Sequence, residues 1–195
     1  MRRLLTICVV IGLIAAISCP LEATVIVLNF DDITSQVTDD VVIPDGYGGL
    51  NWDKFGVIHK DFYDDDGFEN GTVSGDYVAF NRGSLSASVS NGTFDFVGAY
   101  LTAAWNNGLN IDVEGFLGPT PLYSTTVIVD TTGPTWFDFD YTGIDKVVFT
   151  SYGGTNAGLD GSGTHFAMDN FTFIPEPATI VLLGLGTVLL CKHKR

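Results

Sequence analysis

The stretch from residue 24 to residue 174 is a succession of short apolar and β-branched runs separated by turn-forming pairs such as Asn107-Gly108. In one of these runs Leu85, Ala87 and Val89 alternate with serines, which is the pattern of a strand with one buried face. No segment of the stretch repeats its apolar residues at the 3.6-residue period of an amphipathic helix. The pattern therefore predicts an all-β fold, a single antiparallel β-sandwich with the jelly roll as its leading topology.

Nine runs are the candidate strands: Val25–Phe30, Tyr77–Phe80, Leu85–Ser90, Phe94–Thr102, Leu109–Gly115, Leu122–Val129, Trp136–Tyr141, Lys146–Ser151 and Phe166–Phe173. Asn91-Gly92 and Gly153-Gly154 carry the residue types that favour turns between them. The segment from Asp39 to Gly75 is richer in Gly and Asp and less periodic. It predicts long loops, with Trp52–Ile58 as the one weak strand candidate. Long loops at one end of a sandwich often carry function.

Composition and charge limit what the middle segment can do. Of the 195 residues, 46% are hydrophobic and 12% aromatic, enough for one ordered domain rather than a disordered chain. The formal charge is −14, and the segment between the two ends keeps only four basic side chains against 21 acidic ones. Such a surface repels a phosphate backbone, which argues against nucleic-acid binding, but it suits divalent cations or basic partners.

All three cysteines, Cys8, Cys19 and Cys191, lie in the terminal segments. Neither a disulfide nor a cysteine metal site can therefore hold the middle segment together. Hydrophobic packing, with or without a metal bound by oxygen atoms, has to stabilise the domain.

Residues 1–23 have the parts of a secretory signal peptide. Arg2-Arg3 forms a short basic start, an apolar run extends from Leu4 to Ile17, and Leu21-Glu22-Ala23 provides a cleavage site. The segment predicts a helix that signal peptidase removes after Ala23. Two alternatives stay open, namely lipoprotein processing at Cys19 and an uncleaved anchor, for which the apolar run is short.

Residues 175–195 place three features in order: Pro175-Glu176-Pro177, an apolar stretch from Ile180 to Cys191, and the basic end Lys192-His193-Lys194-Arg195. The apolar stretch predicts a short helix. Twelve helical residues rise about 18 Å, short of a hydrocarbon core of about 30 Å. We therefore expect transient membrane association rather than a permanent transmembrane helix, with the basic end on the cytoplasmic side.

This order of features resembles the PEP-CTERM sorting signal of Gram-negative bacteria. The resemblance implies that the chain is exported across the inner membrane and handled by an exosortase, a membrane transpeptidase-like enzyme. It also implies a final location at the cell surface or in an extracellular polysaccharide or biofilm matrix. It does not imply that the chain is itself an enzyme.

Two acidic motifs stand near the ends of the middle segment. Asn29-Phe30-Asp31-Asp32 closes the first predicted strand, and Met168-Asp169-Asn170-Phe171 lies in the last. With the strands between them, they resemble the carbohydrate-binding-module and galactose-binding-like jelly rolls, in which the first and last strands pair. That resemblance implies a structural calcium ion held partly by Asp31, Asp32 and Asp169, with other oxygen atoms completing its shell. The alternative is that these carboxylates are solvated strand ends.

The acidic run Asp61–Gly67 does not form an EF-hand loop. Aligning Gly67 with the glycine of such a loop places Phe62 at the first ligand position and Val73 at the closing glutamate. The run predicts either a looser cation-binding loop or, more often for such sequences, a solvated acidic turn.

No catalytic residue is assigned. The middle segment holds only His59 and His165, lacks a Gly-x-Ser-x-Gly elbow, and has too many acidic residues to single out a pair. Aromatic side chains in or beside the predicted loops are instead candidates for stacking against sugar rings. These are Tyr47, Trp52, Tyr63 and Trp105, and the alternative for each is a place in the core.

These features favour a non-enzymatic domain, exported to the surface or matrix, that binds glycan or serves as a matrix component. One alternative is a glycosidase-like enzyme on the same scaffold, which predicts two carboxylates converging in a deep groove, at least one with a raised pKa. Another is a structural protein that contributes bulk and charge, with neither a groove nor an aromatic platform.

Overall fold

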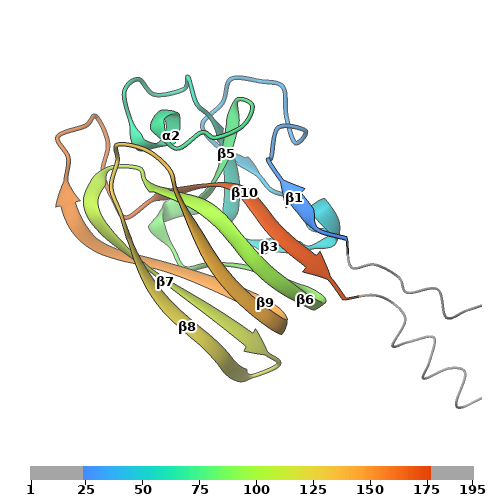
Figure 1. The fold of residues 1–195 in the computed structure, drawn as a ribbon. Coiled ribbons are helices and arrows are strands. Elements are labelled where there is room, and N and C mark those ends of the chain that lie inside the picture. Colours follow the sequence, from blue (N-terminus) through green and yellow to red (C-terminus); the bar gives the residue numbers. More distant parts are fainter. Residues whose placement is uncertain (1–23, 177–195) are drawn as a thin grey trace, which may run out of the picture. The chain divides into compact units, whose positions relative to one another are not determined.

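Strands make up most of the part of the chain that the computed structural model describes, residues 24–176 (Figure 1). The predicted signal peptide, the predicted C-terminal helix and Pro177 of the sorting motif lie outside the described residues. The strands are β1 (Ile26–Leu28), β2 (Val41–Val42), β3 (Asn51–Asp53), β4 (Phe55–His59), β5 (Tyr77–Asn81), β6 (Ala87–Ala103), β7 (Asn106–Leu117), β8 (Thr120–Val129), β9 (Thr135–Asn156) and β10 (Phe166–Pro175). Short helical turns are η1 (Tyr47–Gly49), α2 (Gly67–Asn70) and η2 (Arg82–Ser84). None of the helices within residues 24–176 is long and apolar enough to cross a membrane.

All strand pairs are antiparallel, and the strands form one hydrogen-bonded sheet in the order β2-β4-β5-β10-β6-β9-β7-β8. β1 pairs with β10 outside this path, and β3 pairs with β6. β6 is thus the central strand, with β10 and β9 as its main neighbours. Over residues 87–90 and 93–98, buried and part-buried residues alternate as expected for a strand with one face on the core.

The sheet closes over a single large aromatic core. Phe55 on β4 packs edge-on against Phe149 on β9, with ring centroids 5.8 Å apart, although three strands separate β4 from β9 along the sheet. Phe96 on β6 stacks on Phe171 of β10 at 4.7 Å. β6 and β10 are neighbours in the sheet, but the contact between Phe55 and Phe149 requires the sheet to fold back on itself, as the layers of a sandwich do. Val25–Glu176 is a compact unit with a core built from its own strands, which is what an independently folding domain needs.

The structure confirms the all-β class, the antiparallel pairing and the pairing of the first strand with the last. Ile26 of β1 lies opposite Phe173 of β10, and Leu28 opposite Phe171. The jelly-roll order of connections stays a prediction.

Several predicted strand breaks are wrong. Asn91-Gly92, predicted to be a turn, lies inside the continuous strand β6, where φ is +150° at Asn91 and +56° at Gly92. The pair produces a shift of register against β9 between Ser90 and Phe94 rather than a chain reversal. β9 likewise runs without interruption through the gap predicted between Tyr141 and Lys146 and through the predicted turn at Gly153-Gly154. The predicted turn at Asn107-Gly108 lies inside β7.

The loop prediction for residues 39–75 is also only partly right. The segment contains β2, η1 and α2, and the weak strand predicted over Trp52–Ile58 is two strands, β3 and β4. Lys54 separates them with a φ of +59°, and its carbonyl accepts a hydrogen bond from Arg82 N (2.9 Å). A lysine in this left-handed region leaves no signal in the sequence, because glycine and asparagine are the usual markers of such a bend.

We expect the Lys54→Gly substitution to stabilise the domain by about 0.5 kcal/mol, because glycine adopts the left-handed conformation without the steric cost of a side chain. Lys54→Val should lower stability by about 1–2 kcal/mol, since a β-branched residue fits that conformation worst. Urea unfolding of residues 24–176 measures both changes. Equal effects of the two substitutions would contradict the role given to the φ angle.

Candidate functional site

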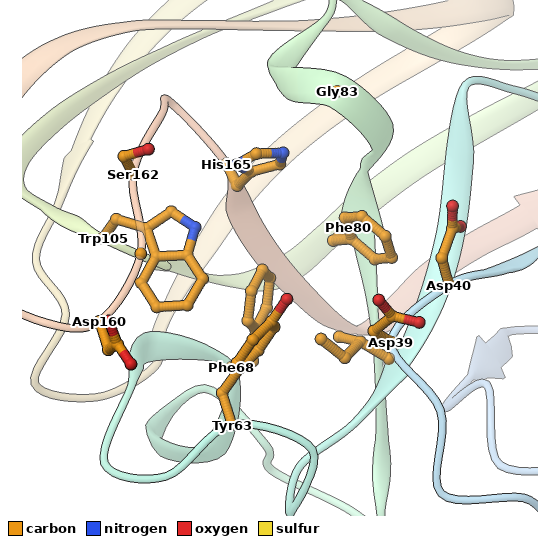
Figure 2. A pocket seen from close by; sticks show the side chains of 12 residues that line it. Asp39, Asp40, Tyr63, Phe68, Phe80, Gly83, Trp105, Asp160, Ser162 and His165 are labelled. Atoms are coloured by element: carbon orange, nitrogen blue, oxygen red, sulfur yellow. The ribbon is translucent and has the colours of Figure 1, made fainter.

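A cavity of about 310 Å³ opens where several loops meet at one end of the domain (Figure 2). Its floor is a small apolar cluster, separate from the main core, that includes Ile58, Phe68, Phe80 and Trp105. Its rim is polar. The lining residues are Asp39, Asp40, Ile58, Tyr63, Phe68, Phe80, Gly83, Trp105, Asp160, Gly161, Ser162 and His165.

Two of the four aromatic residues predicted to bind ligand meet in this cavity. Tyr63, in the loop between β4 and α2, packs edge-on against Trp105, which follows β6, with ring centroids 5.4 Å apart. Phe68 also packs edge-on against Trp105, with ring centroids 5.5 Å apart. Tyr63 is 38% exposed whereas Trp105 is 5% exposed, so Tyr63 offers the accessible aromatic surface and Trp105 the wall behind it.

The other two predicted aromatic residues lie elsewhere. Trp52 is a core residue that contacts Phe30, Phe55 and Phe171, and its indole N–H donates to the Tyr47 carbonyl (3.0 Å). Tyr47 is half-buried beside it. The structure therefore gives both residues a packing role and does not support their assignment to a ligand-binding surface.

The acidic run predicted as a cation loop or solvated turn contains the residue that starts helix α2. Asp66 is the N-cap, and its Oδ1 accepts hydrogen bonds from Phe68 N (2.8 Å) and Glu69 N (2.9 Å). The next residue has to be a glycine, because a Cβ at Gly67 would lie 1.8 Å from the Ala103 carbonyl oxygen. This close contact brings Phe68 into the cavity floor.

The loop between β9 and β10 forms one wall of the cavity by packing on Trp105. A Cβ at Gly161 would lie 2.5 Å from the indole ring, so the glycine backbone rests against that ring. Asn156 donates to the Gly161 carbonyl (3.2 Å), and Ala157 N donates to the Trp105 carbonyl (2.9 Å). These contacts fix Asp160 and Ser162 at the rim.

The charges at the rim are mostly negative. Asp40 forms a bidentate pair with Arg82, with Nε–Oδ1 at 2.6 Å and Nη2–Oδ2 at 2.7 Å, so its charge is balanced. Asp39 and Asp160 are exposed on opposite sides of the cavity (Figure 2). Burial lowers the pKa of His165, which is therefore neutral at pH 7, and its Nδ1 lies 3.0 Å from Ser84 Oγ.

The carboxylates predicted to bind calcium are distributed over two places. Asp31 Oδ1 accepts from Asp76 N (2.7 Å) and Tyr77 N (3.2 Å), and Asp169 Oδ2 accepts from Val73 N (2.8 Å) and Ser74 N (2.9 Å). The two carboxylates thus hold the same loop before β5.

Asp32 instead accepts a hydrogen bond from the Tyr47 hydroxyl (2.8 Å). Across residues 24–176, no group of three or more His, Cys, Asp or Glu side chains is arranged to hold a metal ion. The geometry gives the calcium assignment no support, and it stays a prediction.

Sequence reasoning missed most of the polar rim. In the sequence, nothing distinguishes Asp39 and Asp40 from the other acidic residues. Asp160 belongs to no motif that would mark it as a binding residue. Their proximity depends on which loops the sheet brings to the same end. The sequence holds no local signal of that arrangement.

No protein-family model matches this chain, and no curated protein matches it. Among solved structures, the carbohydrate-binding module TmCBM61, determined in complex with beta-1,4-galactotriose, aligns with 71% of this chain and 99% of its own. The sequence identity is 13% and the TM-score 0.41. A likeness of this size does not identify the function of this chain.

The pH dependence of stability should reveal the buried cap residue. Burial raises the pKa of Asp66 from 3.8 to about 6, so the folded state binds a proton more tightly than the unfolded chain. This contribution to stability is present below pH 4 and is lost as the pH rises to about 6. Through this group, the free energy of unfolding of the wild-type domain should fall by roughly 2 kcal/mol between pH 4 and pH 7. We expect Asp66→Asn, which keeps an oxygen for the N-cap but does not titrate, to abolish that decrease.

Asp66→Ala is the matched control, because it removes both the titrating group and the cap. It should lower stability by about 1 kcal/mol relative to Asp66→Asn at all pH values. Chemical unfolding at a series of pH values measures both variants. A pH profile of Asp66→Asn that follows the wild-type profile would exclude Asp66 as the titrating group.

Proposed function

We propose that this chain is an exported, non-catalytic protein whose domain binds a short segment of extracellular polysaccharide in the cavity at its loop end. The observation that supports binding there is the combination of an accessible aromatic ring, Tyr63, with an apolar floor and exposed carboxylates at the rim. A pyranose ring has apolar C–H faces and a belt of hydroxyl groups. The aromatic ring would pack against a C–H face, and the carboxylates of Asp39 and Asp160 would accept hydrogen bonds from hydroxyl groups.

The arrangement of carboxylates supports binding over glycoside hydrolysis. A glycosidase needs a carboxylic acid with a raised pKa in the groove. Burial raises the pKa values of Asp66 and Asp169, but both accept backbone hydrogen bonds and neither lines the cavity. At the rim itself, the carboxylate of Asp40 is held by Arg82.

Export and sorting rest on the two terminal segments of the sequence. Signal peptidase would release the N-terminus after Ala23, and an exosortase would act on the tail at Pro175-Glu176-Pro177. The domain's last strand ends at Pro175, opposite Phe94, and Glu176 N donates to the Thr93 carbonyl (3.1 Å). The motif therefore begins where the sheet ends. In this proposal the membrane is a transient location of the chain, and the cell surface or matrix is its final one.

Glycan binding is tested by calorimetry of residues 24–176 with neutral and with uronic-acid oligosaccharides. We expect a neutral oligosaccharide to bind and the uronic acids to bind more weakly, because Asp39 and Asp160 repel a carboxylate. Tyr63→Ala should weaken binding about tenfold through the lost ring contact. Tyr152→Ala, which removes an exposed tyrosine on β9, is the control and should leave affinity unchanged.

Absence of binding to every polysaccharide tested would remove the glycan proposal and favour the structural, matrix-forming alternative. Equal losses in Tyr63→Ala and Tyr152→Ala would place the binding surface away from the cavity.

Export is tested separately by expressing the full chain in a Gram-negative host with and without an exosortase. We expect mass spectrometry to find Thr24 as the mature N-terminus in both hosts, since signal peptidase acts independently of the tail. The segment after Pro177 should be lost only where the exosortase is present. A chain that keeps residues 1–23 in both hosts would contradict cleavage by signal peptidase after Ala23 without affecting the binding site.

A further inference from the structure

Two carboxylates at the rim of the cavity have no structural partner. Asp39 and Asp160 line it from opposite sides, and both are exposed (Figure 2). Elsewhere in residues 24–176, acidic side chains serve the fold by accepting backbone N–H groups. These include Asp31, Asp45, Asp66, Asp95, Asp130, Asp145 and Asp169. Among the described residues, Asp39 and Asp160 accept no such bond and form no ion pair, so the fold leaves both available to a ligand.

No positive side chain in the cavity wall offsets these two charges, as far as residues 24–176 show. Arg82 lies beside the rim, but its guanidinium already holds Asp40 through two hydrogen bonds of 2.6 and 2.7 Å. Burial lowers the pKa of His165, whose ring is therefore neutral at pH 7. None of the lysines within residues 24–176 lines the cavity. The cavity thus presents two uncompensated negative charges, which attract a cationic group.

The surroundings of these carboxylates suit an organic cation better than a metal ion. A metal ion needs several ligand atoms that converge on one point, and no group of three or more His, Cys, Asp or Glu side chains within residues 24–176 is so arranged. The cavity instead has aromatic walls, in which the Tyr63 ring is 38% exposed and packs edge-on against Trp105. A protonated amine is attracted both to carboxylates and to the faces of aromatic rings.

We propose that the cavity binds an amino sugar whose amino group is free and protonated, within a polysaccharide that is at least partly de-N-acetylated. This inference rests on the proposed function, because it names the sugar that the cavity takes. The C–H face of the sugar packs on Tyr63 and the apolar floor, and the ammonium group lies toward Asp39 or Asp160. An N-acetyl group removes the positive charge and a uronic acid reverses it, so both bind less tightly.

Three tetrasaccharides that share one linkage and differ only at the second ring carbon test the proposal, by calorimetry on residues 24–176. Their units are glucosamine, N-acetylglucosamine and glucose, which carry an ammonium, an acetamide and a hydroxyl group at that carbon. At about pH 6.5, amino groups are protonated. We expect the glucosamine oligomer to bind about tenfold more tightly than the other two. Added salt should reduce this preference, because it screens exposed charges.

Asp39→Asn and Asp160→Asn should each lower that preference about threefold, and the double substitution should abolish it. Asparagine keeps an oxygen that accepts hydrogen bonds, so the affinity for the glucose oligomer should stay nearly the same. Asp140→Asn is the control, because it removes the same charge from an exposed position outside the cavity. The φ angle there is +50°, which asparagine tolerates, and this variant should keep the full preference.

Equal affinities for the three oligomers would overturn the amino-sugar assignment and leave glycan binding intact, whereas binding of none of them would overturn both. A preference that survives in the double variant would place the ammonium group away from Asp39 and Asp160. Tetralysine, a peptide of similar positive charge, is the last probe. If it bound as tightly as the glucosamine oligomer, and Tyr63→Ala weakened neither, the cavity would attract cations in general, and the assignment to a sugar would be wrong.

Discussion

The antiparallel ladder between β6 and β10 is the contact on which the rest of the structure depends. It joins the half of the sheet that contains β5, β4 and β1 to the half that contains β9, β7 and β8. Its register, with Phe166 opposite Ala103, also builds the cavity, because Trp105 follows β6 and His165 precedes β10 at the same end. The bond from Ala104 N to the His165 carbonyl (3.0 Å) extends the ladder to that point. A slip of one residue would turn the aromatic face of β10 away from the core and separate the two walls of the cavity.

Carboxylates replace covalent cross-links in this domain. Within residues 24–176 there is no cysteine, and the loops are held by side chains that accept backbone N–H groups from segments distant in sequence. Asp31, in the turn after β1, and Asp169, on β10, hold the loop before β5, and Asp66 starts the helix beneath the cavity. At Asp66 and Asp169, burial disfavours the charged form and the hydrogen bonds favour it, so these two residues stabilise loop geometry more than they add net stability. The acidic composition is in part a structural device.

The sequence predicted what depends on local pattern and missed what depends on distant contacts. Alternation in Leu85, Ala87 and Val89 was enough for the fold class, because strand periodicity is local. Asn91-Gly92 has the composition of a turn, yet β9 pairs with the strand on both sides of it and draws it into a bulge. Tyr63 and Trp105 were identified as loop aromatics, but so was Trp52, which lies in the core. Residue type alone cannot distinguish an aromatic side chain that lines a cavity from one that fills the interior.

The direction of β10 relates the cavity to the chain ends. Phe166 lies at the cavity end of the strand, and Pro175, nine residues along, ends it roughly 30 Å away at about 3.4 Å per residue. Because Ile26 pairs with Phe173, the first strand starts at that same far end, so both termini leave the domain away from the cavity (Figure 1). If the tail is processed as proposed, its loss leaves the residues around Tyr63 undisturbed, because they owe their positions to β6, α2 and the loop before β10.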